Sequence, residues 1–348
     1  MIKRFFSFTL VCLGLVFLGS CEKEVNNGPS EELLRLNAYI KVLKLENPNL
    51  SIDSTESGLY YITEINGDGN YPQKDEYILF NYTAYNLNED AYETTIEADA
   101  KLHSIYSKAT RYTPKYIQHK SENTRLPKGL EEGFSLIRKG SKVRFIMPSS
   151  LAYGVNNYLS LSAYTSVIFD VDFRDIVSDP VAYELKTITE YVTANYPDIT
   201  PANVITKLNE TGVFILEESR MDVEASGDGS TSDDPYQTIN DKDILNVNYA
   251  GRFTDSWLFD TNIKSVDEEN ETYNSSKTYE PIKVTIGGSG FIEGFSIAIK
   301  QLKTNTKAKV IIRSKYAYGE IGDGKGIPPY APLIFELEVL KKTTSANQ

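Results

Sequence analysis

The stretch that decides the fold is residues 281–340, which contain four short motifs in a fixed order: Gly290-Phe-Ile-Glu-Gly-Phe295, Tyr316-Ala-Tyr-Gly319, Ile327-Pro-Pro-Tyr330 and Ile334-Phe-Glu-Leu-Glu338. The motifs gather aromatic and branched side chains, with almost no residues suited to acid–base or metal chemistry. A single ring on a strand would be interpreted as core. Together the motifs predict a hollow lined by rings, which can alter a conformation without making or breaking a covalent bond.

The same landmarks occur earlier in the chain, at an offset of 165 to 167 residues. The corresponding segments are Asn81-Tyr-Thr-Ala with Asn248-Tyr-Ala-Gly, Leu151-Ala-Tyr-Gly with Tyr316-Ala-Tyr-Gly, and Ile168-Phe-Asp-Val-Asp with Ile334-Phe-Glu-Leu-Glu. Because this period is too long for a solenoid repeat, it predicts two whole domains in tandem. We expect the first domain at residues 30–178, the second at 179–342 and a tail at 343–348.

Each copy shows helical spacing first and strand signals afterwards. Ser30 is expected to cap a helix that ends before Asn47-Pro48, and residues 183–195 are the corresponding helix of the second copy. The strands of each copy are interrupted by one short helix, at residues 130–139 and 295–303. The pattern predicts an α+β fold, in which two antiparallel half-barrel sheets each wrap a short helix and each follow an N-terminal helix.

Residues 95–122 look like a basic and aromatic insertion in the first domain, and a contact with a partner is one interpretation of it. Solvated decoration is the alternative that we favour. The segment contains both histidines of the chain, His103 and His119, which we expect to be exposed. The second domain has neither His nor Cys, which excludes thiol and imidazole nucleophiles or metal sites there. No cofactor and no metal ion are expected.

The N-terminus resembles the signal peptide of a bacterial lipoprotein. Lys3 and Arg4 precede an apolar run that is too short for a convincing membrane span and that ends in Leu18-Gly19-Ser20-Cys21. The resemblance implies removal of residues 1–20, lipidation of Cys21 and a polar tether at residues 21–29. The protein would then be exported and lipid-anchored to the bacterial cell envelope, with the outer membrane favoured. An ordinary secretory signal with a chance cysteine is the alternative.

The net charge of −12 disfavours nucleic-acid binding, because a phosphate backbone would be repelled. Tyrosine is over-used, with 24 residues against one tryptophan. Tyrosine buries an aromatic body while keeping a polar tip, so it suits surfaces that hold peptides or glycans.

In order and spacing, residues 212–341 resemble the FKBP-type peptidyl-prolyl cis/trans isomerases, and residues 59–176 resemble them more loosely. The family's catalytic positions correspond to Tyr249, Phe259, Asp260, Phe295, Tyr318, Ile327 and Phe335. Its further substrate-binding positions correspond to Val284, Phe291, Ile292, Asp323 and Tyr330. The resemblance implies an isomerase that assists the folding of exported proteins, with X-Pro polypeptides as substrates and macrolides as possible inhibitors.

The peptide bond explains why such a site needs no nucleophile. Rotation about the C–N bond meets a barrier of about 18–20 kcal/mol. An aromatic hollow disfavours the planar, charge-separated form of the amide, and a few donors can hold the twisted form. By resemblance, the Tyr318 hydroxyl and the Ile327 backbone N–H bind peptide carbonyls, Asp260 aligns them, and the rings hold the proline.

The first domain departs from this pattern. Tyr92-Glu93 replaces the Phe-Asp pair, Leu126-Pro127 replaces the pair before the helix, and Leu130 stands at the floor of the hollow. These changes predict a retained fold with weak or absent activity. The competing hypothesis for the whole chain is a catalytically silent lipoprotein whose tyrosine-rich faces bind a client, a partner subunit or a glycan.

Overall fold

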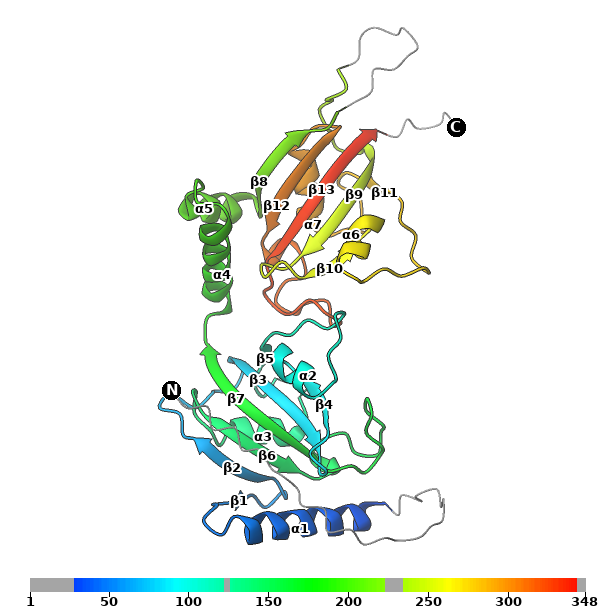
Figure 1. Cartoon of the computed structure of the whole chain (residues 1–348). Helices are drawn as coiled ribbons and strands as arrows, with labels where there is room; N and C mark the ends of the chain where they lie inside the picture. Colours follow the sequence, from blue (N-terminus) through cyan, green and yellow to red (C-terminus); the bar gives the residue numbers. More distant parts are fainter. Residues whose placement is uncertain (1–27, 122–125, 223–233, 343–348) are drawn as a thin grey trace.

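The computed structural model describes residues 28–121, 126–222 and 234–342. Two antiparallel sheets follow one another along the chain, each with its own helices (Figure 1). The predicted α+β class with two tandem domains is confirmed. The predicted signal peptide, Cys21, most of the tether and the tail lie outside the described residues. Within the described ranges, no helix combines the length and apolar character needed to cross a membrane.

The first sheet has the strand order β1-β2-β6-β7-β3-β4, with β5 paired to β3. Its strands are β1 (Asp53–Ser54), β2 (Tyr60–Ile65), β3 (Tyr77–Asn86), β4 (Ala91–Thr94), β5 (Lys115–Gln118), β6 (Lys142–Met147) and β7 (Val167–Val177). The helices of this copy are α1 (Pro29–Glu46), α2 (Glu97–Leu102) and α3 (Lys128–Phe134), and a 3-10 turn, η1 (Ser149–Leu151), follows β6.

The second sheet has the order β10-β9-β13-β12-β8, with β11 paired to β9. Its strands are β8 (Val213–Arg220), β9 (Ile244–Arg252), β10 (Leu258–Thr261), β11 (Ile282–Thr285), β12 (Thr306–Ile312) and β13 (Leu333–Lys342). The helices are α4 (Pro180–Asn195), α5 (Pro201–Thr211), α6 (Lys264–Glu269) and α7 (Glu293–Lys300), with the 3-10 turn η2 (Ser314–Tyr316) after β12. From β8 onward, the elements repeat the order of the first copy from β2 onward.

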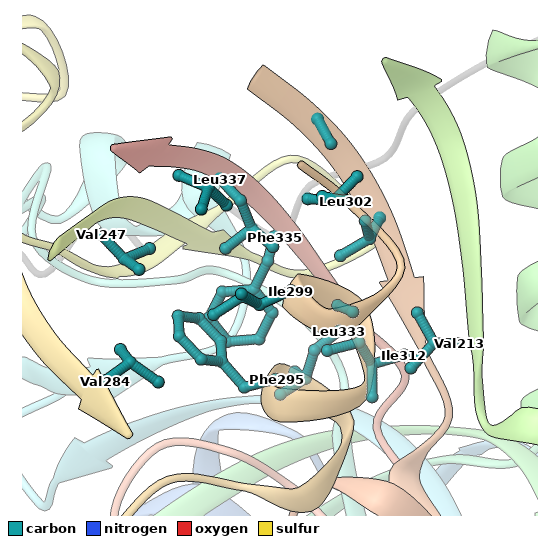
Figure 2. Packing of buried hydrophobic residues seen from close by; sticks show 14 of the residues in the cluster. Val213, Val247, Val284, Phe295, Ile299, Leu302, Ile312, Leu333, Phe335 and Leu337 are labelled. Carbon is teal, nitrogen blue, oxygen red and sulfur yellow. The ribbon is translucent and has the colours of Figure 1, made fainter. Parts of the chain in front are cut away.

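Side chains alternate between the two faces along a strand, and apolar residues point to both faces of each sheet. Both faces of each sheet are therefore covered. On β12, Val310 and Ile312 point into the core that α7 closes, whereas Ile311 packs in the cluster beneath α4 and α5. Figure 2 shows the inner core, where Ile299 of α7 lies beside Phe335 of β13. In the first copy, α1 covers the outer face in the same way.

A buried glutamate joins each N-terminal helix to the sheet beneath it. Glu184 of α4 is 1% exposed, and its carboxylate accepts the backbone N–H of Ser314 at 2.6 Å. Glu32 of α1 does the same for the N–H of Ser149, whose hydroxyl it also accepts at 2.7 Å. Because η2 leads directly to Tyr318, α4 anchors the turn that carries this residue.

The segment 95–122 is not an insertion specific to the first domain. Residues 264–285 of the second domain contain the same succession of a short helix and an edge strand. Even the internal ring stack recurs, as Tyr106 on Tyr112 at 5.7 Å and Tyr273 on Tyr279 at 5.6 Å. The segment belongs to the repeated unit. Its residues differ so much from those of its counterpart in the second domain that the sequence alone hides the correspondence.

Two further sequence predictions are wrong. His119 is fully buried, because its backbone pairs with Glu76 beside β3 and its ring packs beneath α3. Burial lowers the pKa of this histidine. Helix α1 begins at Pro29 rather than after a Ser30 cap, since proline is suited to the first helical position.

The two domains are joined by two residues, Ser178 and Asp179, between β7 and α4. Asp179 caps α4 by accepting the N–H of Ala182 at 2.9 Å. Tyr116 of β5 stacks on Tyr183 of α4 at 5.5 Å, so rings support the joint from the first domain.

We expect Glu184→Ala to destabilise the second domain by about 1.5–3 kcal/mol, because the Ser314 N–H and the Arg313 guanidinium lose a buried charged acceptor. Urea unfolding followed by fluorescence measures this, since the single tryptophan, Trp257, lies in the second domain. The matched variant Glu32→Ala should leave the Trp257 transition in place. An unchanged midpoint for Glu184→Ala would contradict the anchoring role.

Candidate functional site

The predicted aromatic residues of the second domain come from neighbouring elements. Tyr249 lies on β9, Phe335 on β13 and Phe295 in the first turn of α7. Strand β9 pairs with β13 on one side and with β10 on the other, and the register places Phe335 opposite Gly251. Phe259 on β10 is therefore brought to the same end of the sheet.

These rings contact one another at near-perpendicular angles. Phe295 meets Phe335 with centroids 5.3 Å apart, Phe259 meets Phe335 at 5.8 Å and Tyr249 meets Phe295 at 5.9 Å. Figure 2 shows the rings of Phe295 and Phe335 next to each other, with Val284 to one side of them. Edge-to-face pairs of this kind are favourable beyond their buried area. The structure thus assembles four of the predicted rings into one cluster, named the aromatic cluster below.

The aromatic cluster is covered at its base and open on one side. Phe295 and Phe335 are only 3% and 5% exposed, whereas Phe291, which stacks on Phe295 at 5.6 Å, is 41% exposed. Tyr318 is 38% exposed. Val284 is fully enclosed by the core and offers no surface to a substrate, so its predicted binding role is wrong.

Two cavities elsewhere in the molecule do not include any predicted site residue. One of about 250 Å³ lies outside the second sheet and is lined by Tyr191, Arg252, Phe253, Ser256, Lys309, Ile334 and Glu336. Another of about 630 Å³ lies in the first domain between α1 and residues 160–166. The aromatic cluster belongs to neither cavity. It reaches solvent through its half-buried members Tyr249 and Phe259 and through the neighbouring Phe291, and its chemistry marks it as the candidate site.

Asp260 lies in a hydrogen-bonded network at the edge of the cluster. Its carboxylate accepts the Tyr249 hydroxyl at 2.5 Å and the Lys277 ammonium at 2.9 Å. Lys277 also pairs with Asp267 at 3.3 Å. Burial and the bond to Asp260 raise the pKa of Tyr249. Sequence reasoning missed Lys277, whose only signal is that it is the one cation among residues 274–280.

Tyr318 faces the same polar edge. Partial burial, together with the carboxylates of Asp323 and Asp260, raises the pKa of Tyr318, so its hydroxyl keeps its proton at neutral pH. The side chain is exposed enough to donate to a bound ligand.

Ile327 does not present its N–H as predicted. Asp323 accepts the backbone N–H groups of Lys325, Gly326 and Ile327, each at 2.8 Å, and these bonds outweigh burial to lower its pKa. A peptide carbonyl would have to displace this carboxylate. The Ile327 side chain is buried in the same hydrophobic core as Phe295 and Phe335.

Tyr330 faces the first domain rather than the cluster. Its backbone N–H donates to Gly319 at 2.9 Å, and its ring meets the edge of Tyr77 at 5.8 Å. The prediction that Tyr330 binds substrate is therefore not supported by its contacts. An inter-domain contact of this kind leaves no local pattern in the sequence.

The corresponding surface of the first domain is filled by its own side chains. Tyr158 stacks flat on Tyr153 at 3.9 Å, and its hydroxyl donates to Glu93 at 3.1 Å. Tyr153 is the counterpart of Tyr318, and Tyr158 occupies the position of Asp323. Sequence reasoning attributed the loss of this site to Glu93 and Leu130, and it missed the tyrosine that covers it.

A glycine makes the aromatic cluster possible. A Cβ atom on Gly251 would lie 2.5 Å from Cζ of Phe259 and 3.1 Å from Cε1 of Phe335. We expect Gly251→Ala to destabilise the second domain by about 1–3 kcal/mol through overpacking. Thermal unfolding checks this, with Gly326→Ala as control because its added Cβ meets nothing within 4 Å. Equal midpoints for the two variants would contradict the close approach.

Comparison with known proteins gives a consistent result. The family described as "FKBP-type peptidyl-prolyl cis-trans isomerase" matches residues 71–174 and 236–340, more than half of the chain. FK506-binding protein 1B of Aspergillus fumigatus is 36% identical over 99 residues, 28% of this chain and 78% of the relative. Peptidyl-prolyl cis-trans isomerase Fkbp12 of Drosophila melanogaster is 33% identical over 117 residues, 34% of this chain and 91% of the relative.

Among solved structures, the three FKBP domains of wheat FKBP73 match at 14% identity over 84% of this chain and 99% of that chain, with a TM-score of 0.29. The family match falls once in each copy of the repeated unit. The chain therefore belongs to the FKBP-type peptidyl-prolyl cis-trans isomerases and contains two such domains in tandem.

Proposed function

We propose that the second domain catalyses cis/trans isomerisation of X-Pro bonds at the aromatic cluster, and that the protein assists the folding of exported polypeptides. The observation that supports this most is that the aromatic cluster meets solvent at Tyr249 and Phe259, close to the part-exposed Tyr318. The half-buried Phe259, backed by the buried rings of Phe295 and Phe335, offers an apolar surface for a prolyl ring, and Tyr318 lies near its polar edge.

Catalysis at this surface would be non-covalent. Contact with the rings removes water from the prolyl amide, and the planar, charge-separated form of the amide is the one that water favours. The protonated Tyr318 hydroxyl donates to a carbonyl turned out of plane. Asp260 holds Tyr249 in place, so its role is to fix the wall of the site. Interactions that form only with the twisted amide lower the barrier.

A second donor is supplied by the start of α7. The first N–H groups of a helix have no partner within the helix, and Ile292 at this N-cap packs against the core that contains Phe295 and Phe335. We assign the role of second donor to the Ile292 N–H, in place of the Ile327 N–H, which Asp323 already binds. The predicted role of Ile292 is thereby extended from apolar contact to hydrogen bonding.

The first domain has a structural role in this proposal, because Tyr158 covers the surface on which a proline would lie. The relative from Aspergillus fumigatus is named for binding FK506. We extend macrolide binding to the aromatic cluster of the second domain alone. The same covering explains why the first domain would not bind such a ligand.

Isomerisation of an X-Pro peptide by the full chain, followed by NMR exchange or a protease-coupled assay, tests the proposal. Tyr318→Phe should reduce kcat/KM roughly tenfold, because one hydrogen bond to the twisted amide is lost. Phe335→Ala should reduce it further by removing a floor ring. The matched variant Tyr153→Phe should leave the rate unchanged. A wild-type chain that binds the peptide without accelerating exchange would favour the silent binder instead.

We also propose that Cys21 is lipidated and anchors the protein to the bacterial envelope. The support is the sequence Leu18-Gly19-Ser20-Cys21 after an apolar run. We expect Cys21→Ser to move the expressed protein from the membrane fraction to the soluble fraction, because a covalent lipid is the anchor. Immunoblotting of separated fractions measures this. Cys12→Ser is the control, and retention of Cys21→Ser in the membrane fraction would refute the anchor.

A further inference from the structure

Strand β10 carries two residues of the candidate site, Phe259 and Asp260, and is weakly attached to the sheet. It is four residues long, lies at the end of the sheet order, and shifts register against β9 between Leu258 and Asp260. A short edge strand with a bulge is held by few ladder bonds. The position of Phe259 and Asp260 therefore depends on residues 253–257, the turn that joins β9 to β10.

The first domain contacts this turn through Arg111. The guanidinium carbon lies 3.8 Å from the centroid of the Phe253 ring, and Nε and Nη2 donate to Asp255 Oδ2 at 2.8 Å and 2.6 Å. Phe253 in turn packs on Phe259 with centroids 5.1 Å apart. A cation from one domain thus supports the ring that backs the candidate site of the other.

The first domain also contacts the loop at residues 320–330, which lies on another side of the candidate site. The Tyr77 hydroxyl donates to the Glu320 carbonyl at 3.3 Å, and its ring meets Tyr330. Glu320 and Tyr330 flank Asp323 and Ile327. In Figure 1, this loop and the segment between α2 and β5 lie where the two domains meet. Lys108 adds an ion pair with Glu271 at 2.5 Å.

An exposed ion pair alone contributes little to stability, so the charge of the Arg111–Asp255 pair is not the main source of this support. Arg111 combines two donors with a stacked ring, and its side chain is only 23% exposed. We propose that the first domain positions the aromatic cluster of the second, with Arg111 and Tyr77 as positioning residues. This inference rests on the isomerase function proposed above.

The full chain with Arg111→Ala tests the inference in the X-Pro assay. We expect a loss of roughly threefold to tenfold in kcat/KM, because β10 and its two site residues lose their anchor. Asp255→Ala should have the same effect, and the double variant should be no worse than either single variant. Arg111→Lys, which keeps the cation but not the fork, should recover part of the rate.

Lys101→Ala is the matched control. Lys101 also pairs with a carboxylate (Glu97) and lies over an aromatic ring (Tyr106), but both partners belong to the first domain. It should leave the rate unchanged. Trp257, at the end of the contacted turn, provides a second readout, and its emission should shift in Arg111→Ala but not in Lys101→Ala. An active wild type whose kcat/KM is unaffected by Arg111→Ala would overturn this inference alone. An inactive wild type would overturn the proposed function and the positioning role with it.

Discussion

The contact between Phe295 and Phe335 is the interaction on which the second domain depends. It joins α7 to β13, which pairs with β9 on one side and β12 on the other, and it buries both rings almost completely. The same two rings form the floor beneath Tyr249 and Phe259. Core and candidate site are therefore one structure, and truncating either ring would cost about 3–5 kcal/mol as well as the floor.

The two domains show how one scaffold supports opposite outcomes. Both keep the buried glutamate under the turn after the second-last strand, so this device belongs to the fold. Besides the substitutions at Glu93 and Leu130, they differ at a loop position, where Tyr158 lies flat over Tyr153 and Asp323 instead folds back on its own loop. Because the position lies outside the sheet, the exchange of a ring for a carboxylate closes or opens the surface without altering the strands.

Much of this arrangement could be predicted from the sequence, because alternation along strands and a constant offset between copies are local and repeated signals. Phe335 and Tyr318 were placed by such landmarks. The segment 95–122 was misjudged because its counterpart in the second copy keeps the geometry but few of the residues. Tyr330 and the Ile327 N–H could not be placed, since one depends on a contact between domains and the other on a carboxylate bending back within its own loop.

The strand order also bears on how the molecule is made. In each sheet a central strand, β7 or β13, is the last of its copy to leave the ribosome, so neither sheet can close before its final segment is available. At about 5–20 residues per second, the roughly 80 residues between the end of β7 and the turn at residues 253–257 take about four to sixteen seconds to emerge, and the first domain can complete itself in that time. A finished first domain is then already in place when the nascent turn at residues 253–257 appears, and it can act as a scaffold in cis for the half of the chain that follows.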